Sequence, residues 1–105
     1  MNFHNLTESE KNIVFECLKA SLHGPFFPDW EFQTLFGVER TVLNDIEEKW
    51  PEVDFNEQTV SLALNNAMGN LVGYPHGQEK SWEKYISVSP DAVLNLIKKI
   101  KSSDS

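Results

Sequence analysis

Apolar side chains recur three and four positions apart along most of this chain, which is the spacing of amphipathic helices. The first stripe of this kind consists of Val14, Phe15, Leu18 and Leu22. Thr7 followed by Glu10 forms a capping box that predicts the start of this helix. Gly24 and Pro25 predict its end, because neither residue continues a helix readily.

The same periodicity predicts three more main helices, over residues 39–50, from a cap at Asp54 or Asn56 to about Val72, and from Pro90 onward. Their stripes are Val42, Leu43, Ile46 and Trp50, then Val60, Leu64, Ala67, Met68 and Leu71, and finally Val93, Leu96, Ile97 and Ile100. Ser89 is expected to cap the last helix, with proline at the favoured first position. Ala63, Ala67 and Gly69 are expected to let a neighbouring helix approach closely.

Two shorter helices fit between these. Trp30 to Phe36 follows Asp29, a candidate cap, and is closed by Gly37, and a second short helix covers residues 82–86. No pair of strands joined by a hairpin turn is evident. The sequence therefore predicts an all-α fold, a compact orthogonal bundle of four main helices plus one or two short ones. We expect one domain over residues 1–105, frayed at 1–5 and 102–105.

Composition indicates an ordinary globular protein that does not cross a membrane. Of the 105 residues, 40% are hydrophobic and 24% are charged, so a packed core is expected. No run approaches the roughly 20 apolar residues that span a bilayer, and no signal peptide is visible. Cys17 is the lone cysteine and cannot form an internal disulfide, which favours a reducing, cytoplasmic location.

The net charge of −7 is confined to residues 29–57, because the remainder of the chain is neutral. This acidic segment contains only two bases, Arg40 and Lys49. Its acids are Asp29, Glu31, Glu39, Asp45, Glu47, Glu48, Glu52, Asp54 and Glu57. A field of one sign favours a basic partner and disfavours polyanions such as nucleic acid and anionic membranes.

The stretch FQTLFGVERTVLNDI has the outline of a helix-turn-helix, with Gly37 in the turn. Its second helix is more acidic than basic, however, so it would repel phosphate. Gln33 also stands where the helices of such a motif usually need a small residue. We therefore expect no DNA binding, and a diverged helix-turn-helix that binds protein remains an alternative.

Catalytic and metal-binding signals are sparse. The acids of EVDFNE lack the central glycine and closing glutamate of a calcium loop, and no histidines are paired at helical spacing. Cys17 is expected to be an inert thiol of the first helix. His76, on a turn beside Tyr74, could serve as a general acid or base, and a small enzyme centred on this pair is a second alternative. We expect no enzyme activity, no cofactor and no metal.

The acids with their neighbouring aromatic residues give the candidate binding site. Trp30 and Phe27 are possible surface anchors beside carboxylates, while Phe32 and Phe36 have core spacing. Asp45, Glu48 and Glu52 are expected to share one face of the third main helix, where like charges repel by about 0.2–0.5 kcal/mol per pair. The candidate partner-binding residues are Phe27, Asp29, Trp30, Glu31, Asp45, Glu48 and Glu52.

In size, acidity and helical pattern the chain resembles the small immunity proteins of bacterial toxin systems, of the nuclease-colicin and contact-dependent growth inhibition types. Many of these proteins carry an acidic helix face with one or two aromatic anchors, here Asp45, Glu48 and Glu52 with Trp30 or Phe27. The resemblance implies a protein that binds a basic toxin domain, such as a nuclease, and blocks its substrate site. Its acidic side chains would take the place of phosphates.

Overall fold

The structure is a computed structural model that describes Phe3 and residues 6–102. Most positions at which the sequence predicts fraying therefore lie outside the described residues. Phe3 itself is buried and stacks on Phe55, with ring centroids 5.8 Å apart.

The described chain is all-α, as predicted, with no strand in residues 6–102. The main helices are α1 (Glu8–His23), α3 (Arg40–Lys49), α4 (Gln58–Gly73) and α6 (Pro90–Ser102). The short elements are α2 (Asp29–Phe36), the 3₁₀ turn η1 (Glu79–Ser81) and α5 (Trp82–Tyr85).

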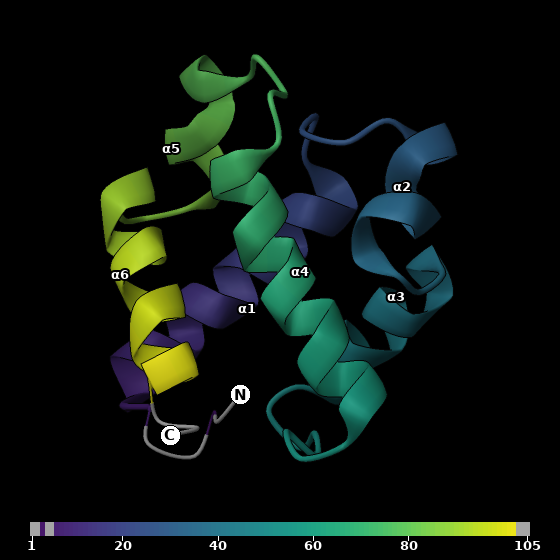
Figure 1. Ribbon diagram of the computed structural model, residues 1–105, viewed down its shortest axis with the longest axis vertical. Coiled ribbons are helices and arrows are strands. Elements are labelled where there is room, and N and C mark those ends of the chain that lie inside the picture. Colours follow the sequence, from purple (N-terminus) through teal and green to yellow (C-terminus); the bar gives the residue numbers. More distant parts are fainter. Residues whose placement is uncertain (1–2, 4–5, 103–105) are drawn as a thin grey trace.

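Helices α1 and α4 form the centre of the bundle and cross one another (Figure 1). Helix α6 packs against α4 on one side, while α2 and α3 lie on the other side. Helix α5 stands at the end of the molecule where α4 finishes. The buried apolar side chains form one cluster between these layers.

The helix ends show which capping predictions are correct. Thr7 and Glu10 form the complete capping box of α1, and Ser89 Oγ accepts a hydrogen bond from the N–H of Ala92 at the start of α6. Gly37 closes α2 in the left-handed conformation, with φ of 71°, which favours glycine. The predicted cap of α2 is wrong, because this helix already includes Asp29 and makes no side-chain cap.

The predicted caps of α4 are also wrong. Its N-cap is Glu57, whose side chain accepts a hydrogen bond from the N–H of Val60. Asp54 instead accepts from the N–H of Asn56 and shapes the loop before the helix. Both carboxylates therefore organise the connection between α3 and α4.

The aromatic loop between α1 and α2 belongs to the core. Phe26 meets the rings of His76, Trp82 and Tyr85 edge-on. Phe27 packs against Phe36 and Tyr74. Because the loop bridges α2 with the segment after α4, it buries aromatic residues that helical periodicity alone does not place.

Two asparagines of α4 hold the C-terminal end of α2. Asn66 Nδ2 donates to the carbonyl oxygen of Phe36 at 2.8 Å, and Asn70 Nδ2 donates to that of Leu35 at 2.8 Å. These carbonyl groups belong to the last turn of α2, where no N–H group of the helix is available to donate to them. The asparagines lower the helix propensity of α4 and in return fix α2 against it.

Of the small residues expected to permit close packing, Ala63 and Ala67 are fully buried. The expectation for Gly69 is wrong, because it is exposed and a Cβ built there would meet no atom within 4 Å. The small residues that permit close packing against α4 are therefore the two alanines and not Gly69.

Asn70→Ala is expected to lower the free energy of unfolding by about 1 kcal/mol more than Asn65→Ala, because it leaves the Leu35 carbonyl without its donor. Asn65 lies half-buried on the same helix and makes no side-chain hydrogen bond in the described part of the chain. The comparison therefore cancels the helix propensity that alanine gains. Urea unfolding measures both variants, and equal losses would contradict the role of Asn70.

Candidate functional site

Arg40, the only arginine of the chain, makes contacts that join α3 to α1 and α2. Its Nη1 donates to the carbonyl oxygen of Leu22 at 2.8 Å, and its Nη2 pairs with Asp29 at 2.6 Å. The guanidinium also lies over the ring of Phe32, 4.2 Å from its centroid. One of the two bases of the acidic segment is therefore paired within the chain, with one of its acids.

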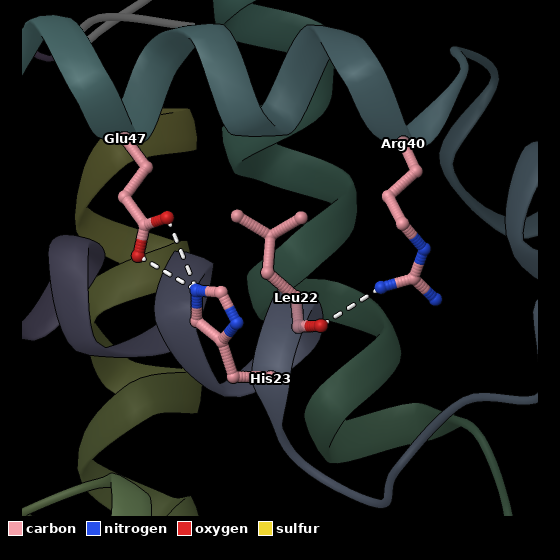
Figure 2. A network of polar contacts seen from close by, with 4 residues as sticks. All are labelled: Leu22, His23, Arg40 and Glu47. Carbon is pink, nitrogen blue, oxygen red and sulfur yellow. Dashed lines mark hydrogen bonds and ion pairs between the residues drawn. The ribbon is translucent and has the colours of Figure 1, made fainter.

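A second contact ties α3 to the same end of α1. Figure 2 shows Arg40 and Glu47 extending from one side of α3 toward Leu22 and His23. His23 Nε2 lies 2.9 Å and 3.1 Å from the two carboxylate oxygens of Glu47. A histidine at a helix C-terminus also complements the helix dipole when protonated. This side of α3 therefore contacts the C-terminal end of α1.

Other acids of the segment have local structural tasks. Glu31 accepts a hydrogen bond from the Tyr74 hydroxyl, which raises the pKa of that hydroxyl, with burial adding to the effect. Backbone N–H groups of Thr59 and Val60 hold the pKa of Glu57 below its ordinary value. The hydrogen bonds at Glu57 favour its ionised form, and both acids have a structural role.

A groove of about 370 Å³ lies between the C-terminal half of α3 and the start of α4. Its apolar lining residues are buried or half-buried and form the floor: Val42, Ile46, Val53 and Val60. Its charged lining residues are exposed and form the rim: Asp45, Lys49, Glu52, Asp54 and Glu57. Four carboxylates thus face one ammonium group over an apolar floor, and we call this feature the acidic groove.

Two rim carboxylates have no internal partner within the described residues. The side-chain carboxylates of Asp45 and Glu52 make no hydrogen bond or ion pair there, in contrast to those of Asp54 and Glu57, which accept from backbone N–H groups. Lys49 likewise makes no ion pair in this part of the chain. The negative field at the groove is therefore not neutralised by contact.

The structure brings together only part of the predicted site. Asp45 and Glu52 share the acidic groove, although Glu52 does not belong to the helix as predicted, because α3 ends at Lys49. Glu48 is exposed on α3 but does not line the groove. The predicted shared helix face of three acids is therefore reduced to a groove containing two of them.

The predicted aromatic anchors differ in exposure. Trp30 is 80% exposed, between Asp29 and Glu31, and none of these three residues lines the acidic groove. Phe27 is only 7% exposed, because it packs into the aromatic core. The expectation of Phe27 as a surface anchor is therefore wrong, while Trp30 is available to a partner.

Helical periodicity does not predict the apolar floor of the groove. Val53 follows the end of α3 and belongs to no helical stripe, and the periodicity predicts Val60 in the core stripe of α4. A signal was present, because apolar residues alternate with acids from Glu52 to Phe55. Such alternation beside a helix end is typical of a surface with an apolar side and a charged side.

The His76 alternative gains no support from the geometry. Its Nε2 donates to the carbonyl oxygen of Leu71 at 3.0 Å, and its Nδ1 accepts from the N–H of Gln78 at 2.9 Å. With both ring nitrogens bound to backbone, the imidazole stabilises the turn after α4 and has no nitrogen directed at a substrate. Tyr74 is likewise engaged with Glu31.

Cys17 offers no reactive thiol, and the described side chains form no metal site. Cys17 is fully buried, and burial raises the pKa of its thiol to about 12, which keeps it protonated and unreactive. No three histidine, cysteine or acidic side chains among the described residues are placed to hold a metal ion. Across residues 6–102, none of the helices has the length and apolar character needed to cross a membrane.

A second groove of about 550 Å³ lies where α5 meets α6. Its lining includes Trp82, Ile86 and Pro90, and its only charged side chains are Glu79 and Glu83. It is larger than the acidic groove, but it contains half as many carboxylates and none of the predicted partner-binding residues. The acidic groove is therefore the better candidate for a charged partner.

Comparison of this chain with protein families, with curated proteins and with solved structures finds no match.

Arg40→Lys is expected to lower the free energy of unfolding by about 1–2 kcal/mol, because lysine keeps the charge but loses the planar contacts with Leu22, Asp29 and Phe32. Lys49→Gln serves as the control and is expected to change stability by less than about 0.5 kcal/mol. Chemical denaturation measures both. A loss at Lys49 as large as that at Arg40 would contradict the division between a structural and a surface base.

Proposed function

We propose that this protein is a binding protein of the immunity type, which neutralises a basic, nuclease-like toxin domain. The observation that carries the proposal is the acidic groove, whose Asp45 and Glu52 carboxylates have no internal partner in the described chain. The resemblance to bacterial immunity proteins in size, acidity and helical pattern supports the same proposal. On this proposal the protein acts in the cytoplasm of a bacterium.

The chemistry of the groove favours a cationic protein over other ligands. Unpaired carboxylates around an apolar floor attract basic side chains electrostatically and also offer apolar surface to their neighbours. A nuclease presents such basic side chains where it binds phosphate. Carboxylates that occupy those positions would exclude the nucleic acid substrate.

Trp30 supplies a second contact under this proposal. Its exposed ring stands between Asp29, which Arg40 holds, and Glu31, which Tyr74 holds. An aromatic side chain on a fixed backbone loses little conformational freedom on binding, and tryptophan is common among residues that dominate binding energy. We propose that Trp30 anchors the complex while the groove provides charge complementarity.

The test is binding to the toxin-like product of the neighbouring gene at low and high salt. Asp45→Lys combined with Glu52→Lys is expected to weaken binding by about tenfold or more, mainly at low salt, because attraction becomes repulsion. Glu39→Lys with Glu48→Lys is the matched control, since it makes the same change of net charge outside the groove. The toxin's nuclease activity reports inhibition in parallel.

Three results would contradict the proposal: no binding to any toxin-like neighbour, binding that is indifferent to both double variants, or equal weakening by the groove and control variants. The last result would mean that net charge alone attracts the partner. Circular dichroism of each variant checks that the helices remain folded.

A further inference from the structure

We infer that the acidic groove receives an arginine side chain of the partner, with Lys49 limiting the affinity. This inference rests on the proposed function and deepens it, because it names the chemical group that the groove selects. Its elements are the apolar floor, the two unpaired carboxylates and the single rim ammonium group.

The floor matches the stem of a long cationic side chain. Val42, Ile46 and Val60 present half-buried or buried aliphatic surface beneath exposed carboxylates. Lysine and arginine both bury their methylene groups on apolar surface while the charged head stays near polar groups. A short or purely apolar side chain would leave either the floor or the rim without a partner.

The rim favours arginine over lysine. Asp45 projects from α3, whereas Glu52 comes from the segment after it, so the two carboxylates reach the groove from different parts of the backbone. A guanidinium has five donors in one plane and can bind two carboxylates at once. It is also more weakly hydrated than an ammonium group and loses less on entering a groove with an apolar floor.

Lys49 opposes the incoming cation. It is the only base on the rim and is not held in an ion pair by any acid within the described residues. Its charge therefore repels a second cation placed near Asp45, at a strength that salt reduces. Lys49 thus lowers the affinity of the groove for a cation through its charge.

Capped tripeptides with arginine, lysine or norleucine between two glycines test this inference without the toxin. Methyl chemical shifts of Val42, Ile46, Val53 and Val60 report occupancy of the groove. The arginine peptide is expected to bind about threefold or more tightly than the lysine peptide, with the norleucine peptide weakest. Lys49→Gln is expected to tighten arginine binding about threefold.

Asp45→Asn with Glu52→Gln should abolish the shifts, while Glu39→Gln with Glu48→Gln, which removes two charges outside the groove, should preserve most of the binding. Equal binding of arginine and lysine, an absence of shifts at these four residues, or weaker binding by Lys49→Gln would each overturn the inference. If the arginine peptide binds but no toxin does, the groove selects arginine and the proposed function fails. If the toxin binds and the peptide does not, only the inference fails.

Discussion

The hydrogen bond from Arg40 to the carbonyl oxygen of Leu22 is the contact on which the arrangement of the N-terminal half depends. The same guanidinium pairs with Asp29 and covers Phe32, so one side chain at the start of α3 joins the end of α1 to the start of α2. Glu47 and His23 form a second contact between α3 and α1, about two turns further along α3 (Figure 2). Helix α3 is thereby fixed in rotation as well as in position.

This fixed rotation determines which charges remain for a partner. The side of α3 that carries Arg40 and Glu47 meets α1, so Asp45 is turned toward the groove beside α4. A chain with only two bases in its acidic segment uses one of them for the fold. The packing therefore leaves Asp45 and Glu52 unpaired at the groove. Their negative charge is concentrated at one place, which solubility alone does not require.

Much of the fold could be predicted because helical periodicity and caps are local. The stripes of α1 and α6, the Thr7 capping box and the Gly37 stop all depend on residues a few positions apart. Two of the wrong predictions concern contacts between residues far apart in the sequence. Asp29 leaves its expected cap for Arg40 eleven residues away, and Phe27 is buried by Tyr74, which lies far along the chain. For the site, local charge identified Asp45 and Glu52, but the floor requires the α3–α4 packing that periodicity does not give.

The central claim is that Asp45 and Glu52 serve binding and not folding, and the free energy of unfolding of the Asp45→Asn, Glu52→Gln double variant tests it most directly. Urea denaturation at low ionic strength is expected to show a stability equal to or above that of the unmodified chain, because two uncompensated charges are removed and no internal partner is lost. A loss of more than about 1 kcal/mol would show that these carboxylates stabilise the fold and would contradict the account.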